Sequence, residues 1–308
     1  MAARPAIRLT LGERPDSTGI RDGSIPIRGF DITFESAAPT GYQAMATNPP
    51  FEGGELPFAT YLQAFDHDSP LIALPIFTTR VFEHNQLTVR PGAGVESPRD
   101  LEGKRISSGL WGTNPSVWLR GLLTHQYDVA TERVIWVHNR PEYFADSPAP
   151  ARYQVENLGP DETVDAAVAA GKVDAVARGR VSDATPALFA DPMPEIKAYY
   201  RQTEVFPPNT VLMVRRDAVE KHPDLAPALL EAFGSAMKQN KDQIAKGTAP
   251  AALGGLDLSR LDREGIALPD QGFRANVKSI QLMIGYAYEQ GLIRRLYAPE
   301  ELFLLTDS

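Results

Sequence analysis

Arg80 and His84, four residues apart, are the pair in this sequence best suited to chemistry on a carboxylate. Arg80 follows the apolar segment 71–77, an expected strand, so it stands at the carboxyl end of that strand, where α/β sheets bind ligands. A guanidinium group can hold a carboxylate through two parallel hydrogen bonds. An imidazole can transfer protons near neutral pH, because its ordinary pKa is about 6.5. The alternatives are a surface arginine paired with Glu83 and a structural histidine.

A second candidate site lies at the start of the expected helix 115–126. The first turn of a helix offers unpaired backbone N–H groups and the positive end of the helix dipole, and both attract anions. The alternative is helix capping alone, with Asn114 as the N-cap and Pro115 as the first helical residue. An arginine further along this helix would reach a ligand carboxylate or only an acidic side chain of another lobe. The predicted ligand-binding residues of this segment are Thr113, Asn114, Ser116 and Arg120.

Arg178 is a further candidate, because it directly follows the expected strand 173–177. It would hold a second carboxylate of the ligand, and the alternative is a surface charge. The other histidines lack the spacing of metal ligands, so we expect no metal. The sequence contains neither a phosphate-binding loop nor a G-x-G-x-x-G motif, so we expect no nucleotide.

Short strand-like segments alternate with helical ones along the chain, which indicates an α/β architecture with mostly parallel strands. The expected strands are 7–12, 31–36, 71–77, 86–89, 105–108, 134–137, 173–177 and 210–214. The expected helices are 41–47, 115–126, 162–170, 225–244 and 273–290, with a further helix starting at Ser97. Residues 55–62 fit either a strand or the start of a helix.

The middle of the chain is expected to form a lobe of its own. Residues 92–205 would be inserted into a first lobe made of residues 1–91 and 206–308. A two-lobed α/β protein would bind its ligand in the cleft between its lobes and close around it by hinge motion. Pro91-Gly92 and Phe206-Pro207-Pro208 are the expected hinge segments.

The composition is that of an ordinary globular protein. Of its 308 residues, 43% are hydrophobic and 23% are charged. The net charge of −8 and the lack of a basic run argue against nucleic-acid binding. There is no cysteine, so disulfides and thiolate chemistry are excluded. No stretch reaches the roughly 20 apolar residues of a membrane span. The first residues lack the apolar core of a secretory signal, so we expect a cytoplasmic protein, while a homo-oligomer stays open.

Several motifs occur in an order that resembles the 4,5-dihydroxyphthalate decarboxylase family. Residues 74–84, Leu-Pro-Ile-Phe-Thr-Thr-Arg-Val-Phe-Glu-His, resemble its PVFPSRxFRH segment. Residues 100–105 resemble its DLKGKR motif, 118–123 its W-x-RG-I-L motif, 171–175 its GEIDA motif and 206–217 its FPxxHxxxxRRD motif. The similarity covers most of residues 7–240. The individual motifs are widespread, but their ordered combination with Arg80, His84 and Arg120 is more specific.

This resemblance implies a two-lobed, type 2 periplasmic-binding-protein-like fold. It also implies cofactor-independent decarboxylation of a hydroxylated aromatic carboxylate such as 4,5-dihydroxyphthalate. His84 and Glu55 would be the catalytic residues, either of which would protonate the ring carbon. Glu55 is similar in position to a family glutamate, with Glu52 as the second choice and a water-facing loop carboxylate as the alternative. Thr210, a predicted substrate-binding residue, stands where the family often has His, and Glu83 stands where it often has Arg.

Two other functions are compatible with the same sequence features. One is a non-catalytic solute-binding protein for a small carboxylate, which would be expected to carry a secretion signal. The other is a cytoplasmic relative acting on another small aromatic or pyrimidine-type substrate, and the Thr210 and Glu83 differences favour keeping it open. The fold alone does not distinguish these functions, because one fold can carry many activities.

Overall fold

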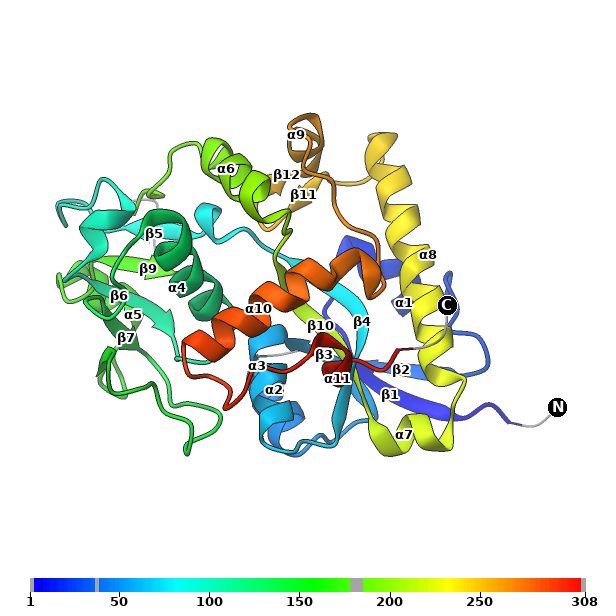
Figure 1. The fold of residues 1–308 in the computed structure, drawn as a ribbon. Helices are drawn as coiled ribbons and strands as arrows, with labels where there is room; N and C mark the ends of the chain where they lie inside the picture. Colours follow the sequence, from blue (N-terminus) through cyan, green and yellow to red (C-terminus); the bar gives the residue numbers. More distant parts are fainter. Residues whose placement is uncertain (1–2, 37–38, 178–184, 306–308) are drawn as a thin grey trace. The chain divides into compact units, whose positions relative to one another are not determined.

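The computed structural model describes residues 3–36, 39–177 and 185–305, and the chain divides into two compact units (Figure 1). The first unit comprises residues 1–80, 208–281 and 297–308, and the second comprises residues 81–207 and 282–296. Each unit contains its own five-stranded sheet. The α/β architecture predicted from the sequence is confirmed.

The sheet of the first unit has the strand order β2-β1-β3-β10-β4. Its strands are β1 (Ala6–Thr10), β2 (Asp31–Glu35), β3 (Gly53–Pro57), β4 (Leu71–Arg80) and β10 (Pro208–Arg215). β1 pairs in parallel with β2 and β3, whereas β10 runs antiparallel between β3 and β4. The prediction of mostly parallel strands therefore holds for only part of this sheet. In the register of β10 and β4, Thr210 lies opposite Thr79 and Pro208 opposite Arg80.

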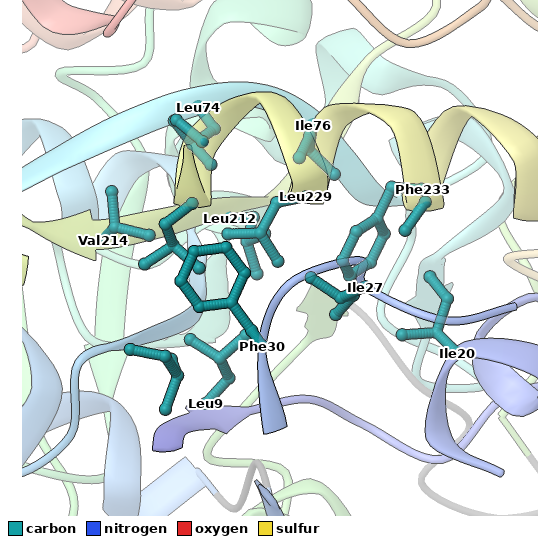
Figure 2. Packing of buried hydrophobic residues seen from close by; sticks show 14 of the residues in the cluster. Leu9, Ile20, Ile27, Phe30, Leu74, Ile76, Leu212, Val214, Leu229 and Phe233 are labelled. Carbon is teal, nitrogen blue, oxygen red and sulfur yellow. The ribbon is translucent and has the colours of Figure 1, made fainter. Parts of the chain in front are cut away.

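Apolar side chains of this sheet pack against the long helix α8 (Leu225–Ala245), as Figure 2 shows. Leu9, Leu74 and Leu212 come from three different strands, and each is fully buried. Leu229 and Phe233 lie one turn apart on the face of α8 that contacts this cluster. The burial of these side chains provides the hydrophobic free energy that holds helix and sheet together.

The sheet of the second unit has the order β5-β9-β6-β7-β8. Its strands are β5 (Leu87–Val89), β6 (Arg105–Gly109), β7 (Ile135–His138), β8 (Gln154–Asn157) and β9 (Ala175–Ala177). Only β5 is antiparallel, and it pairs with β9 at the edge. Its helices include α4 (Asn114–Tyr127), α5 (Val164–Ala169) and α6 (Met193–Thr203).

The remaining elements are short helices and one small hairpin. They are α1 (Thr18–Arg21), α2 (Pro39–Thr47), α3 (Phe58–Asp66), α7 (Arg216–Lys221), α9 (Leu258–Arg263), α10 (Val277–Glu289), α11 (Pro299–Leu302), β11 (Ala252–Leu253) and β12 (Leu256–Asp257). Four 3-10 turns cover Pro15–Ser17, Glu83–Asn85, Pro98–Leu101 and Arg274–Asn276. Within the described ranges, no helix combines the length and apolar character needed to cross a membrane.

The unit boundaries lie elsewhere than the predicted lobe boundaries at residues 91 and 206. Strand β5 belongs to the second unit because it extends that unit's sheet, and Arg90 forms an ion pair of 2.7 Å with Asp174 there. Residues 282–296 also belong to the second unit. The ring of Tyr286 occupies the space that a side chain at Gly121 of α4 would need, with a ring carbon 2.2 Å from an added Cβ. The predicted hinge motion stays a prediction.

Two expected helix starts need correction. Asn114 is not the N-cap of α4, because the preceding Thr113 takes that position and its hydroxyl accepts a hydrogen bond from the Ser116 backbone N–H at 3.3 Å. Asn114 is therefore already helical. The helix expected at Ser97 is only the four-residue 3-10 turn 98–101. Residues 55–62 contain both alternatives, the end of β3 and the start of α3.

We predict that Leu229→Ala will lower the free energy of unfolding by about 2–5 kcal/mol, because it removes a fully buried side chain from the core in Figure 2. Chemical denaturation followed by circular dichroism would measure the change. Gln239→Ala is the matched control, since Gln239 lies exposed on the same helix. Equal stabilities of the two variants would show that this helix face does not hold the first unit together.

Candidate functional site

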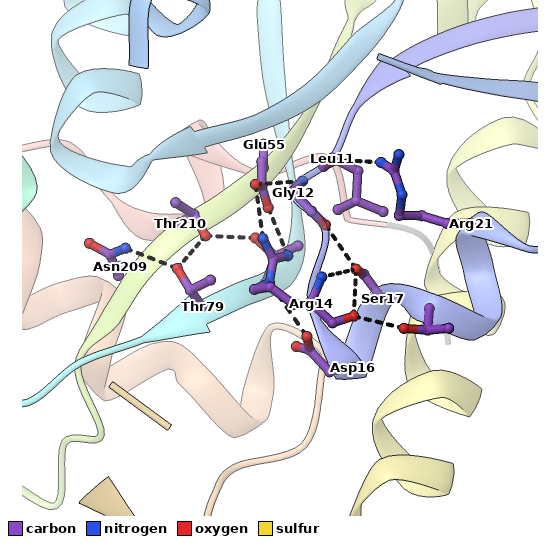
Figure 3. A network of polar contacts seen from close by, with 12 residues as sticks. Leu11, Gly12, Arg14, Asp16, Ser17, Arg21, Glu55, Thr79, Asn209 and Thr210 are labelled. Carbon is purple, nitrogen blue, oxygen red and sulfur yellow. Dashed lines mark hydrogen bonds and ion pairs between the residues drawn. The ribbon is translucent and has the colours of Figure 1, made fainter. Parts of the chain in front are cut away.

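Polar side chains of the first unit gather where β1 and β4 end and β10 begins (Figure 3). We call Arg14, Glu55, Thr79, Asn209 and Thr210 the first-unit cluster. Two of its members, Glu55 and Thr210, were predicted to belong to the site. The structure brings them together because β10 lies beside both β3 and β4 in the sheet. The cluster thus occupies the sheet edge at which open α/β sheets bind ligands.

Glu55 is buried in an ion pair with Arg14. The two guanidinium nitrogens of Arg14 donate to the two carboxylate oxygens at 3.0 and 2.9 Å, and the backbone N–H of Gly12 donates to Oε1 at 2.9 Å. Glu55 is 2% exposed, so the alternative of a loop carboxylate facing water is wrong. Three N–H donors surround this carboxylate, and in this structure it acts as their acceptor.

The sequence analysis did not identify Arg14, although a signal was present. Arg14 comes four residues after the end of β1, and Arg80 is the last residue of β4, so the strand-end argument applied to both. Burial opposes the charge of Arg14, but Glu55 more than offsets this and raises the pKa of the guanidinium above its ordinary value. Burial also raises the pKa of the nearby Asp16 carboxyl, whose oxygen lies 3.4 Å from Arg14 Nε.

The hydroxyl of Thr210 is bonded within the first-unit cluster. Its Oγ1 lies 2.7 Å from the hydroxyl of Thr78 and 2.5 Å from that of Thr79. Asn209 donates from its side-chain amide to Thr79 Oγ1 at 2.9 Å. Thr79 is partly exposed, so this chain of hydroxyl groups leads from a buried threonine toward the surface of the unit.

Arg80 is the last residue of β4 and is 2% exposed, so the alternative of a surface arginine is wrong. Its Nη2 donates to Asn276 Oδ1 at 2.5 Å, and its guanidinium carbon lies 5.1 Å from the centre of the Phe77 ring. Burial lowers the pKa of Arg80 to about 9. The guanidinium group is therefore still charged at neutral pH, although it is removed from water.

In the second unit, the predicted hydroxyl donors at the start of α4 bond to the end of β6. Thr113 and Ser116 lie with their hydroxyl oxygens 2.5 Å apart, and both donate to the Ser108 carbonyl oxygen, at 3.1 and 2.7 Å. Asn114 is fully buried beside them. These contacts favour the capping interpretation for Thr113 and Ser116, and their predicted contact with a ligand stays a prediction.

Arg120 is fully buried in the second unit. It donates from Nε to Gln290 Oε1 and from Nη2 to the Trp111 carbonyl oxygen, both at 2.7 Å, and its guanidinium carbon lies 3.5 Å from the centre of the Trp111 ring. Among the described residues, Nη1 has no hydrogen-bond partner. Burial lowers the pKa of Arg120 to about 9.

The backbone N–H groups that follow β6 are directed at Glu142, a residue that the sequence analysis missed. Trp111 N donates to one of its carboxylate oxygens at 2.5 Å and Gly112 N to the other at 3.2 Å. Burial raises the pKa of the Glu142 carboxyl, although these two hydrogen bonds oppose the change. The backbone N–H groups of residues 111–112 therefore bind a carboxyl group of the same unit, and the predicted ligand site at the start of α4 stays a prediction. Nothing in the spacing of the loop around Glu142 indicated this contact.

His84 lies in the 3-10 turn 83–85 of the second unit and is buried. Its Nε2 is 2.8 Å from Gln126 Oε1. Burial lowers the pKa of the imidazole to about 4, so it is neutral at neutral pH. A small pocket beside it is lined by Glu83, His84, Trp118, Leu122, Tyr199 and Pro207.

Arg178 lies outside the described residues, so its predicted role stays a prediction. In the part of the chain that the structure describes, no three histidine, aspartate or glutamate side chains are grouped in a way that could hold a metal ion.

The two buried histidines predict a loss of stability in acid. The pKa values of His84 and His138 are lowered to about 4, mainly by burial, so below about pH 6.5 the unfolded chain binds protons that the folded chain does not. Stability is therefore complete above about pH 6.5 and falls as the pH decreases toward 4. We expect His138→Asn to reduce the loss between about pH 7.5 and pH 5 by roughly 2 kcal/mol, measured by urea denaturation. The half-exposed His125, replaced by Asn, is the control, and an equal effect there would contradict this assignment.

Comparisons with known proteins support both the sequence motifs and the fold. The chain is 29% identical over 319 residues to a 4,5-dihydroxyphthalate decarboxylase of Comamonas testosteroni, covering 96% of each chain. It is 29% identical over 190 residues to a protein of the same name from Pseudomonas putida, covering 59% of this chain and 72% of the relative. No protein-family model matches the chain.

Solved structures show the fold. The alkanesulfonate-binding protein SsuA from Xanthomonas axonopodis, bound to MOPS, has a TM-score of 0.58 at 15% identity, covering 98% of this chain and 99% of its own. The desulfurization enzyme DszB has a TM-score of 0.54 at 12% identity, and the match covers 97% of this chain and 96% of that enzyme. The predicted fold class and the resemblance found in the motifs are thus confirmed: along almost its whole length, this chain is similar to proteins named 4,5-dihydroxyphthalate decarboxylase, and it has the two-lobed fold of the solute-binding proteins.

Proposed function

We propose that this protein is a cofactor-independent decarboxylase of a hydroxylated aromatic carboxylate, with 4,5-dihydroxyphthalate as the first substrate to test. The observation that carries the proposal is the similarity to the Comamonas testosteroni decarboxylase over 96% of both chains. That match extends over almost the whole chain. The residues themselves supply groups suited to binding carboxylates and to transferring a proton.

Buried arginines are the groups proposed to bind the substrate carboxylates. Arg80 and Arg120 are both desolvated and charged at neutral pH, since their pKa values are lowered only to about 9. A desolvated guanidinium attracts an anion more strongly than an exposed one, because the surrounding dielectric constant is lower. Arg80 also stands at a strand end, which makes it the first choice for the carboxylate that is retained in the product.

The proposed chemistry needs a proton acceptor and a proton source. A base removes the proton of a ring hydroxyl, and the electron pair left on oxygen increases the electron density at the carbon that bears the carboxylate. That carbon takes up a proton, the bond to the carboxylate breaks, and its electron pair restores the aromatic ring as carbon dioxide leaves. Overall, one carboxylate and one proton give one ring C–H bond and one carbon dioxide molecule.

His84 is proposed as the acceptor in this scheme. The sequence suggested that it would protonate the ring carbon, but an imidazole with a pKa of about 4 has no acidic proton to give at neutral pH. The proton source is then a different group. Glu55 was the other choice, and the ion pair with Arg14 makes positioning of that arginine the role its contacts favour.

A solute-binding protein is the second candidate function. The observation that favours it is the fold, which this chain shares with the alkanesulfonate-binding protein from Xanthomonas axonopodis. The same fold occurs in the desulfurization enzyme, so it does not decide between binding and catalysis.

Incubation with 4,5-dihydroxyphthalate and related aromatic mono- and dicarboxylates tests the proposal. We expect the release of carbon dioxide, measured by gas detection, and a product lacking one carboxylate, identified by chromatography. Calorimetry with the same compounds would detect binding. Binding without carbon dioxide release would support the solute-binding function, and neither binding nor turnover with any of these compounds would contradict both functions for this ligand class.

We predict that Arg80→Ala will weaken binding of an aromatic dicarboxylate roughly 10- to 100-fold, because a hydrogen bond to a charged group contributes about 1.5–3 kcal/mol. Isothermal calorimetry of the variant would measure this. Arg28→Ala is the control, since the side chain of Arg28 is 77% exposed and lies in the same unit. An unchanged affinity of Arg80→Ala would remove Arg80 from the site.

Glu55→Gln distinguishes the two roles of Glu55. If Glu55 holds Arg14, the change removes a bidentate ion pair, and we expect KM to rise with a smaller effect on kcat. Arg14→Lys should then behave alike, because lysine cannot form two parallel bonds. A fall in kcat of roughly 100-fold or more at unchanged KM, seen for Glu55→Gln alone, would instead identify Glu55 as the proton donor.

A further inference from the structure

We infer that Gln126 fixes the protonation of His84, so that Nε2 carries the hydrogen and Nδ1 is left as a buried acceptor. Gln126 lies in the last turn of α4 and approaches the 3-10 turn that carries His84. The contact between them is His84 Nε2 to Gln126 Oε1 at 2.8 Å. An amide oxygen can only accept, so the orientation of this amide decides which imidazole nitrogen is protonated.

The surroundings of Gln126 determine the orientation of its amide. Its Nε2 lies 3.2 Å from the Glu195 carbonyl oxygen and 3.4 Å from the carboxylate oxygen Oε2 of the same residue, both of which are acceptors. That carboxylate also accepts a hydrogen bond from the hydroxyl of Tyr127 at 2.8 Å. Reversing the amide would place its oxygen against two acceptor oxygens and turn its NH₂ group toward His84. The NH₂ group therefore faces Glu195, and the amide oxygen faces His84.

The neutral imidazole has one hydrogen, and the amide oxygen requires it on Nε2. Nδ1 then carries a lone pair, and within the described residues this atom has no hydrogen-bond partner. His84 is 2% exposed, and the rings of Phe82, Phe189 and Tyr199 lie around it with centroid distances of 5.5–6.4 Å. A buried polar atom without a partner costs about 1–3 kcal/mol, so its retention points to a use for this lone pair.

A small pocket lies beside this histidine, with room for about one water molecule. It is lined by His84 itself and by Glu83, Trp118, Leu122, Tyr199 and Pro207. The titratable groups that surround the imidazole are Glu83 on its own turn, Tyr127 on α4, and Glu195 and Tyr199 on α6. The carboxylate of Glu195 is linked to the imidazole through the Gln126 amide, by way of the hydrogen bonds described above.

The catalytic consequence rests on the proposed function. A substrate hydroxyl that donates to His84 Nδ1 can pass its proton to that nitrogen. The imidazole becomes an imidazolium, which keeps its Nε2–H bond to Gln126, and the electron pair of the broken O–H bond stays on the substrate oxygen. Gln126 is thus a positioning residue, and His84 is assigned to accept the hydroxyl proton rather than to protonate carbon.

The tautomer is measured directly in the substrate-free protein by long-range ¹H–¹⁵N NMR on histidine-labelled protein. The protonated and bare nitrogens resonate far apart, and their couplings to the ring hydrogens identify each. His84→Gln assigns the signal among the five histidines. We expect a neutral Nε2–H form that persists unchanged from about pH 8 to pH 5, because the pKa lies near 4. A neutral Nδ1–H form, or titration near pH 6.5, would overturn the inference.

Variants of Gln126 separate positioning from structural support. Gln126→Glu should raise the pKa of His84 by roughly 1–3 units, because an opposite charge then faces the imidazolium, and the acid limb of the kcat profile should move upward equally. Gln126→Met should give a mixture of tautomers. The double variant Gln126→Glu with Glu195→Gln keeps a single carboxylate there and replaces Gln126→Glu if that variant does not fold.

Gln239→Glu is the control, since it adds the same charge at an exposed position of the first unit. An unchanged His84 pKa in both Gln126→Glu and the double variant would overturn the inference. If NMR gives the expected tautomer but no aromatic carboxylate is decarboxylated, the positioning stands and the proposed function fails. If decarboxylation occurs but NMR shows a neutral Nδ1–H form of His84, the proposed function stands and the positioning by Gln126 fails.

Discussion

Desolvation of charged and polar groups is the constraint on which the candidate site residues of both units depend. Removing a guanidinium or carboxylate group from water costs far more free energy than removing a neutral side chain. Each buried charged group must therefore find partners or change its protonation. Glu55 meets this requirement with three N–H donors. Arg80 and Arg120 meet it with amide and carbonyl oxygens, and their pKa values fall while their charge is kept.

The partners differ between the buried cations, and so does the direction of the pKa shift. Arg14 is paired with the carboxylate of Glu55, and its pKa rises, whereas burial lowers the pKa of Arg80 and of Arg120. The proposed role of these last two arginines is to bind the carboxylates of the substrate. The histidine also responds to burial: the pKa of His84 falls to about 4, so its imidazole is neutral at neutral pH.

The sequence predicted what depends on short-range patterns and on strand ends. The position of Arg80 at the end of β4 followed from an apolar run and the polar residues after it, and the start of α4 was misplaced by a single residue. The placement of β10 between β3 and β4 depends on pairing across more than a hundred residues, and no local pattern encodes it. Two partners of the candidate residues were hidden for the same reason, since Glu142 and Gln126 join them only in the folded chain.

Decarboxylation in heavy water tests the central claim most directly. If the protein protonates the ring carbon as the carboxylate leaves, 4,5-dihydroxyphthalate incubated with it in D₂O will release carbon dioxide and give a product with one deuterium at the carbon that carried the carboxylate. Proton NMR of the product would locate that deuterium, and an incubation without protein sets the background. Recovery of the unchanged dicarboxylate, or loss of carbon dioxide without deuterium at that carbon, would contradict this account.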